Sequence, residues 1–115
     1  NFFQLDVNDY NSISKIFKEY KFDYVFHYAA VVGVERTLMN PLAVLKDIEG
    51  IKNIFELSYQ HKIKRVFLAS SSEVYGEPYN LPQHEENTPL NSRLPYAIVK
   101  NIGESFCRSP SRILS

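Results

Sequence analysis

The chain has 115 residues, which is enough for one small domain and excludes a large two-domain enzyme within it. Thirteen basic residues balance thirteen acidic ones, so there is no overall basic field to attract nucleic acid. No apolar stretch reaches the roughly 20 residues of a membrane-spanning helix. The only cysteine, Cys107, excludes an internal disulfide and a cysteine-rich metal site. We therefore expect a globular cytoplasmic protein with no metal, no nucleic-acid partner and no membrane partner.

The first part of the chain predicts a strand, a helix and a second strand. Residues 2–7 are mostly apolar and suit a short strand, and the polar residues Asn8 and Asp9 supply a turn. Apolar residues then recur at helical spacing over residues 13–20. Residues 24–27 form a second short apolar run, which predicts a buried strand.

The middle of the chain predicts a long helix, a third strand and a loop. The helix is expected over residues 40–61, because Asn40 is a favoured N-cap residue and Pro41 suits the first helical position. Residues 66–69 predict the third strand. The segment from residue 73 to residue 95 is long and rich in proline, and such segments in compact domains are usually functional. We interpret it as a loop over an active site.

The last predicted helix begins near Pro95 and runs until Pro110 stops it, and residues 109–115 predict a disordered or truncated tail. The alternation of apolar strands and helices predicts the α/β class. We expect a partial Rossmann-type, doubly wound parallel sheet of about three strands with flanking helices. Because parallel strands are covered on both faces, the following residues are expected to be buried: Val25, Phe26, Val66, Phe67 and Leu68.

Tyr96 and Lys100 are the most informative pair of residues. They lie four positions apart on a predicted helix, so they share one face and stand one turn from each other. A neighbouring ammonium favours the phenolate form of a tyrosine, and a phenolate can act as a general base toward a hydroxyl group. The spacing alone is common on helix surfaces, so the surroundings of the pair decide its meaning.

Hydroxyl groups follow the third predicted strand at its carboxyl end, where an open α/β sheet binds its ligands. They belong to Ser70, Ser71 and Ser72, and the proline-rich loop can return Tyr96 to the same edge of the sheet.

Two further residue types are expected to be structural. His27 is interpreted as a buried strand residue and Cys107 as part of the core. His61 and His84 are expected in exposed loops, and no histidine spacing predicts zinc.

Taken together, these segments resemble the extended short-chain dehydrogenase/reductase superfamily, in particular the NAD-dependent epimerases and dehydratases of nucleotide sugars. The resemblance covers residues 2–108. It implies that residues 1–108 form the central part of an NAD(P)-binding Rossmann-type domain, with NAD as cofactor and a nucleotide sugar as substrate. It also implies a whole enzyme that is a homodimer. Four motifs carry it in the family's order: Asp6-Val7, His27-Tyr28-Ala29-Ala30, residues 70–76 (SSSEVYG) and residues 95–100 (PYAIVK).

The resemblance assigns roles to individual residues. Tyr96 would be the catalytic acid/base, Lys100 would hold the nicotinamide ribose and favour the phenolate, and Ser71 would position the sugar hydroxyl. Ser72 and Glu73 would contact the substrate beside Ser71, and an acidic residue like Glu73 is more typical of nucleotide-sugar decarboxylases and dehydratases than of simple 4-epimerases. The residues expected to bind the cofactor are Asp6, Val7, Tyr28, Ala29, Ala30, Ala69, Ser70, Tyr96 and Lys100.

The chain departs from the family's pattern in two respects. Asp47 stands where the family usually has asparagine. The glycine-rich phosphate loop and the C-terminal substrate domain do not occur in the sequence. We therefore expect an internal fragment of an NAD-dependent epimerase, dehydratase or decarboxylase that is inactive as an isolated chain. The alternatives are a non-catalytic nucleotide-binding relative and a truncated gene product without activity.

Overall fold

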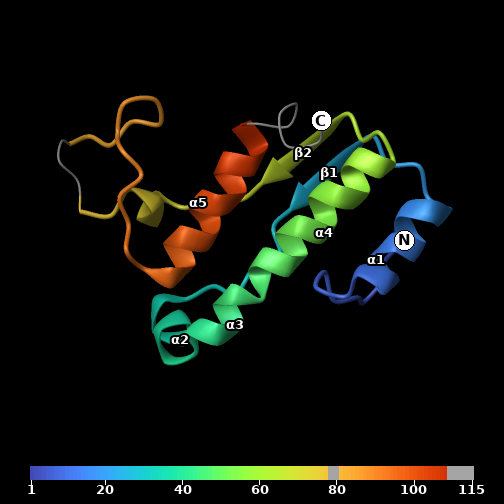
Figure 1. The fold of residues 1–115 in the computed structure, drawn as a ribbon, viewed down its shortest axis with the longest axis horizontal. Coiled ribbons are helices and arrows are strands. Elements are labelled where there is room, and N and C mark those ends of the chain that lie inside the picture. The colour runs from blue at the N-terminus through green and yellow to red at the C-terminus, as the bar shows by residue number, and fades with distance from the viewer. Residues whose placement is uncertain (78–80, 109–115) are drawn as a thin grey trace.

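The structure, a computed structural model, describes residues 1–77 and 81–108. The expected tail at residues 109–115 and three residues of the predicted loop, 78–80, lie outside the described residues. Figure 1 shows the elements, which in chain order are α1 (Tyr10–Glu19), β1 (Tyr24–His27), α2 (Val34–Met39), α3 (Pro41–Leu45), α4 (Asp47–Gln60), β2 (Arg65–Leu68), the 3₁₀ helix η1 (Ser72–Tyr75) and α5 (Pro95–Arg108).

The strands β1 and β2 pair in parallel, with Val25 opposite Val66 and Phe26 opposite Phe67. Parallel pairing requires a long crossover connection. The chain between the two strands supplies it, and α4 lies along the sheet (Figure 1). The predicted α/β class and the parallel sheet are confirmed.

The prediction of a third paired strand is wrong for the described part of the chain. Residues 2–7 form no strand, and the sheet contains only β1 and β2. The strand order of a dinucleotide-binding domain explains this result, because the order 3-2-1-4-5-6 places two strands between the third and the fourth. If residues 2–7 correspond to the third strand and β1 to the fourth, as the resemblance implies, the two segments are not neighbours.

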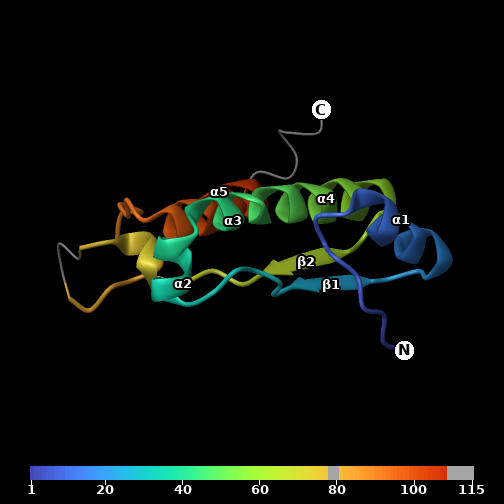
Figure 2. The ribbon, with the colours of Figure 1, turned by 90° about the horizontal axis from the view of Figure 1, so that it is seen from below.

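The helices cover one face of the sheet only. Figure 2 shows α1, α4 and α5 on one side of the strands, and no described helix lies over the opposite face. The expected burial of the strands is therefore wrong: Phe26 is 59% exposed and Phe67 37% exposed. Their rings stack on the open face with centroids 4.6 Å apart. The other three residues expected to be buried are only partly so: Val25, Val66 and Leu68.

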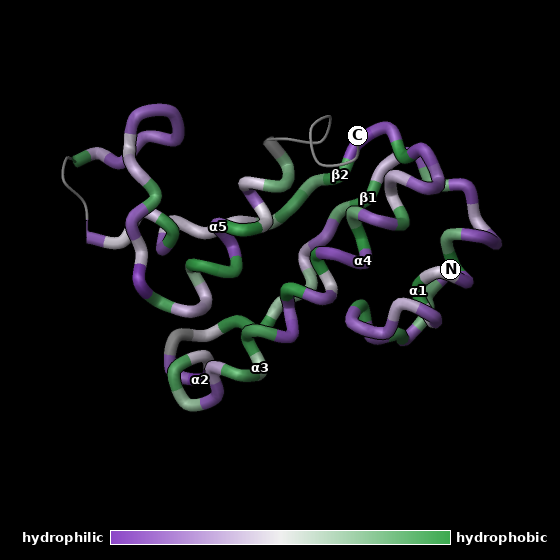
Figure 3. Tube along the Cα trace, in the orientation of Figure 1, coloured by the Kyte–Doolittle hydropathy of each residue, from purple (hydrophilic) through white to green (hydrophobic). Residues whose placement is uncertain are grey.

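α4 connects two hydrophobic clusters on the covered face. One cluster joins Phe17 of α1 to Ile54 and Leu57 of α4. The other consists of Val44 from α3, Ile51 from α4 and Val99 from α5. Figure 3 shows that β2, which lies beneath these helices, is hydrophobic over most of its length. Burial of these apolar side chains stabilises the fold at about 25 cal/mol per Å² removed from water.

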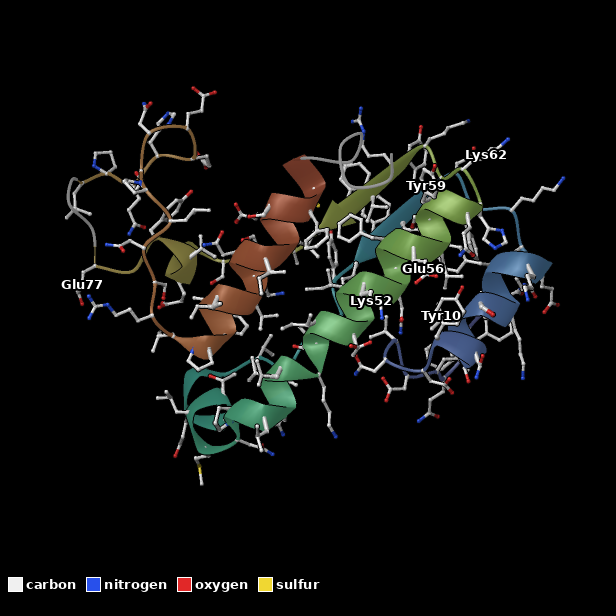
Figure 4. The ribbon with its side chains drawn as sticks, viewed as in Figure 1. Tyr10, Lys52, Glu56, Tyr59, Lys62 and Glu77 are labelled. Carbon is white, nitrogen blue, oxygen red and sulfur yellow. The ribbon has the colours of Figure 1, made fainter. Side chains whose placement is uncertain are left out.

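The outer face of α4 is polar at several positions. Lys52, Glu56 and Tyr59 follow one another along this face (Figure 4), and Tyr59 is 58% exposed. Tyr10 of α1 turns toward α4, where its hydroxyl donates to Oε1 of Gln60 at 3.3 Å.

The predicted helix over residues 40–61 is confirmed as two segments, α3 and α4, with a turn at Lys46. Asn40 is the N-cap of α3, and its side chain accepts the Ala43 N–H at 3.2 Å. The sequence did not predict α2, a six-residue helix whose N-cap, Gly33, provides no side-chain hydrogen bond.

Candidate active site

The site begins at the edge where both strands end. The Ala69 N–H donates to the His27 carbonyl at 3.2 Å, which holds the last residue of β1 beside the first residue after β2. Because the strands are parallel, the segments that leave them start side by side at this edge. These segments contain the small residues 29–30 and the serines 70–72.

A hollow of about 480 Å³ lies beside the end of β1. Four of the residues expected to bind a cofactor lie around it, and the complete lining is Gln4, Leu5, Asp6, Val7, Asn8, Ala29, Ala30, Val31 and Asp47. The exposed carboxylate of Asp6 accepts the Asn8 N–H at 2.9 Å, which stabilises the turn at one side of the hollow. The small side chains of Ala29 and Ala30 keep the other side open to a flat group.

α4 holds residues 7–8 in place through two residues that the sequence analysis did not identify. The Asn53 amide donates to the carbonyls of Val7 and Asn8, at 3.0 and 3.2 Å. A Cβ on Gly50 would lie only 2.8 Å from Val7 Cγ1, so glycine permits this close approach. The signal that could have identified Asn53 is an amide at a helix position that is buried between apolar residues.

Ser71 caps η1, and its hydroxyl oxygen accepts the Glu73 N–H at 3.3 Å. Val74 is only 1% exposed, and its carbonyl accepts the N–H groups of Asn91 and Ser92. These bonds bring the segment that leads into α5 against η1. The segment that follows the serines and the segment that precedes α5 are thus joined by backbone hydrogen bonds.

Gly76 allows the segment that leads into α5 to approach η1 closely. It has φ +64°, which residues with a side chain rarely adopt. A Cβ at this position would lie 2.7 Å from the carbonyl oxygen of Asn91.

Tyr96 and Lys100 lie on one face of α5, as predicted. The Lys100 ammonium lies 5.7 Å from the centroid of the Tyr96 ring. Lys100 is 5% exposed, and burial lowers the pKa of its ammonium while the nearby Asp47 carboxylate raises it. Burial, and then the positive charge of Lys100, lower the pKa of His27, whereas the negative charge of Asp47 raises it. The expectation that His27 is a buried strand residue is confirmed, since it is 6% exposed.

Other predicted residues lie apart from the hollow. The Ser70 hydroxyl donates to the Glu104 carboxylate of α5. Tyr28 is 66% exposed and contacts Phe26 on the open face of the sheet, with ring centroids 6.1 Å apart. Ser72 and Glu73 are exposed on η1.

The described residues contain no group of histidine, cysteine, aspartate and glutamate side chains that could hold a metal ion. Among the same residues, no helix combines the length and the apolar character needed to cross a membrane. His84 is exposed, as expected, whereas His61 is half-buried at the C-terminus of α4. Burial and the Glu104 carboxylate raise the pKa of the partly buried Cys107 thiol.

The chain is similar in sequence to known proteins. UDP-glucose 4-epimerase 2 of Oryza sativa is 33% identical over 108 residues, which is 93% of this chain and 26% of the relative. UDP-glucose 4-epimerase 2 of Arabidopsis thaliana is 34% identical over 97% of this chain and 32% of its own length. The chain thus spans about a third of such relatives or less.

Solved structures of epimerases share the fold. The UDP-Glc/GlcNAc 4-epimerase of Campylobacter jejuni matches with a TM-score of 0.86 and 29% identity, over 94% of this chain and 33% of that one. The UDP-glucose 4-epimerase of Bifidobacterium longum, solved in complex with NAD+ and UDP, matches with a TM-score of 0.85 and 28% identity, over 92% of this chain and 32% of that one. The sequence model of the GDP-mannose 4,6 dehydratase family matches residues 1–112, and the chain belongs to this family.

Proposed function

We propose that the whole protein to which this chain belongs is an NAD-dependent nucleotide-sugar 4-epimerase, in which Ser71, Tyr96 and Lys100 carry the proton chemistry. The observation that supports this proposal best is the arrangement of Tyr96 beneath the buried Lys100 ammonium, on the helix that leads directly from the Ser71 segment. A protein that only bound a nucleotide would have no need of a phenol and a buried ammonium on one face of the same helix.

The hollow at the end of β1 fits part of a dinucleotide. Its rim combines the exposed carboxylate of Asp6 with the small residues Ala29 and Ala30. A carboxylate in this position can accept hydrogen bonds from a ribose, and small side chains let a flat ring approach the backbone. NAD, when bound, would accept a hydride from the sugar carbon.

In this proposal Tyr96 takes the proton from a sugar hydroxyl. The positive charge of Lys100 favours the phenolate of Tyr96, because an opposite charge at short range stabilises the ionised form. The Ser71 hydroxyl would hold the sugar hydroxyl in place by a hydrogen bond. Loss of the proton and of the hydride from the same H–C–O–H group turns the alcohol into a ketone. The reverse steps on the other face of that carbon give the epimer.

The relatives favour epimerisation, since several of them are named UDP-glucose 4-epimerases. Glu73 favours a second candidate, elimination of water next to the ketone, because its exposed carboxylate lies two residues from Ser71 and can act as an additional acid/base. The name of the matching family model, GDP-mannose 4,6 dehydratase, is consistent with that candidate.

Incubation of the whole protein with NAD and separate nucleotide sugars tests the proposal. We expect UDP-glucose to be converted to UDP-galactose without net consumption of NAD, as followed by chromatography of the sugar nucleotides. A product that has lost water, observed by mass spectrometry, would favour the dehydratase alternative. Absence of any conversion across UDP- and GDP-sugars would contradict both.

A further inference from the structure

Three buried titratable side chains influence one another electrostatically near the end of β1, and the proposed function uses only one of them. His27 ends β1, Asp47 begins α4 and Lys100 lies on α5. They are 6%, 8% and 5% exposed, respectively. Ionised side chains are rarely buried to this degree unless they have a charged or hydrogen-bonding partner. The cluster therefore requires an explanation beyond the chemistry of Tyr96.

Asp47 links this cluster to the hollow. Its Oδ2 accepts the Val31 N–H at 2.7 Å, a short bond that fixes the backbone of residues 29–31. Asp47 and Val31 both line the hollow. The carboxylate also stands in the first turn of α4, where the helix dipole stabilises a negative charge.

Asp47 acts electrostatically on the other two members of the cluster. Its charge raises the pKa of Lys100, against the larger effect of burial. It also raises the pKa of His27, against burial and the charge of Lys100. Because these side chains are buried, water and salt screen the interaction between them only weakly.

We propose that Asp47 is a positioning residue of the candidate active site, which anchors residues 29–31 at the rim of the hollow and serves as the buried counter-charge of Lys100 beside Tyr96. The part of this inference that concerns catalysis rests on the proposed function. The part that concerns charge applies to the cluster itself. An asparagine at this position keeps an acceptor for the Val31 N–H but removes the charge, so Asp47→Asn separates the two roles.

The experiment compares Asp47→Asn and Asp47→Ala with a matched control, Glu49→Gln. The control removes a carboxylate from the same helical turn, but this carboxylate is 61% exposed and pairs with Lys52. NMR titration of protein labelled with ¹³C at the lysine side chains measures the pKa of Lys100, assigned with Lys100→Arg. The proton resonances of the imidazole rings report the pKa of His27. Both titrations are made in the whole protein and in the 115-residue chain.

We expect both Asp47 variants to lower the pKa of Lys100 and of His27, whereas Glu49→Gln leaves them at the wild-type values. Thermal unfolding should separate the anchoring role, since Asp47→Ala lowers the midpoint more than Asp47→Asn does. An unchanged Lys100 titration in Asp47→Asn would overturn the inference, as would an equal change in Glu49→Gln. Failure of the proposed function gives a different result from failure of this inference. In that case the wild-type protein converts no nucleotide sugar, but Asp47→Asn still lowers the pKa of Lys100.

Discussion

The Lys100 ammonium stands 5.7 Å from the centroid of the Tyr96 ring, one turn further along α5. Tyr96→Phe keeps the ring and removes the hydroxyl, so it should lower turnover of the whole enzyme by about 10²–10⁴-fold, the usual contribution of general acid/base catalysis. NAD binding should stay close to the wild-type value. Steady-state kinetics and calorimetric titration with NAD measure the two effects.

Tyr59→Phe is the matched control for this substitution. It makes the same chemical change on the exposed face of α4, where Tyr59 is 58% exposed, and should leave turnover unchanged. Wild-type turnover in the Tyr96→Phe enzyme would show that Tyr96 transfers no proton.

Gly76→Ala should destabilise the protein, because a side chain at φ +64° is strained and its Cβ would lie 2.7 Å from the Asn91 carbonyl oxygen. Strain of this kind costs about 1–3 kcal/mol, and the steric contact adds to it. Gly33→Ala is the comparison, since Gly33 also has a positive φ, +101°, but an added Cβ would meet only Arg36 Cβ at 3.8 Å. Chemical denaturation should show the larger loss for Gly76→Ala. Equal losses would mean that the contact with Asn91 does not matter.

Gly103→Ala should also reduce the free energy of unfolding, by about 1–3 kcal/mol, the usual cost of overpacking. The reason is that a Cβ on Gly103 would clash with Leu68 Cδ2, where α5 lies against β2. Leu68→Val shortens the side chain that the new Cβ would meet. The double variant Gly103→Ala/Leu68→Val should therefore lose less free energy of unfolding than the sum of the losses in the two single variants. Strictly additive effects would show that the two residues are not in contact.

The lowered pKa of His27 predicts how the free energy of unfolding depends on pH. Its pKa lies below the ordinary 6.5, chiefly because of burial and then because of Lys100. The unfolded chain therefore takes up a proton at a higher pH than the folded chain. The free energy of unfolding should fall as the pH decreases through 6.5 toward the lowered value, and this contribution should be absent above 6.5.

Thermal unfolding of the wild type, His27→Gln and His84→Gln, at a pH well above and a pH just below that range, measures this effect. The loss of stability on acidification should be smaller in His27→Gln. The exposed His84 serves as the control, so His84→Gln should behave as the wild type does. Equal acid sensitivity in all three proteins would contradict the role of His27.

Local patterns in the sequence predicted most elements of the fold. The apolar run at residues 24–27 forms β1. Asn40 caps α3, as predicted, because its side chain accepts a backbone N–H of the first turn. The exposure of Phe26 could not be predicted, because burial on two faces depends on segments that lie beside the sheet rather than on the strand itself. The strand predicted at residues 2–7 failed for the same reason, since a strand forms only where a neighbour can pair with it.

The candidate site was predictable to a similar extent. Helical spacing placed Tyr96 and Lys100 on one face, because that relationship is local. The bond between Asp47 and the Val31 N–H joins residues 16 positions apart, and nothing in the pattern of either segment indicates it. Asn53 differs, because an amide among the apolar positions of a helix can be singled out, but the pattern does not indicate that this amide donates to the carbonyls of residues 7–8.

The isolated chain of 115 residues is expected neither to bind NAD tightly nor to convert a nucleotide sugar. Recognition of the pyrophosphate in this architecture depends on backbone N–H groups at a glycine-rich turn between a strand and a helix, and no such sequence occurs in the chain. The hollow by itself offers contacts for only part of the cofactor.

The stacked rings of Phe26 and Phe67 on the open face should also promote self-association, since exposed apolar sheet faces and unpaired strand edges do so.

Calorimetric titration with NAD measures the first effect, with the whole protein as the positive control. One-to-one binding in the micromolar range by the isolated chain would show that the hollow and the residues around it are sufficient for recognition. Sedimentation velocity over a range of concentrations measures the second effect. Phe26→Lys should reduce association, because it places a charge on the open face, whereas Tyr59→Lys on the outer face of α4 is the matched control and should not. Association that is equally strong in both variants would locate the contact elsewhere on the chain.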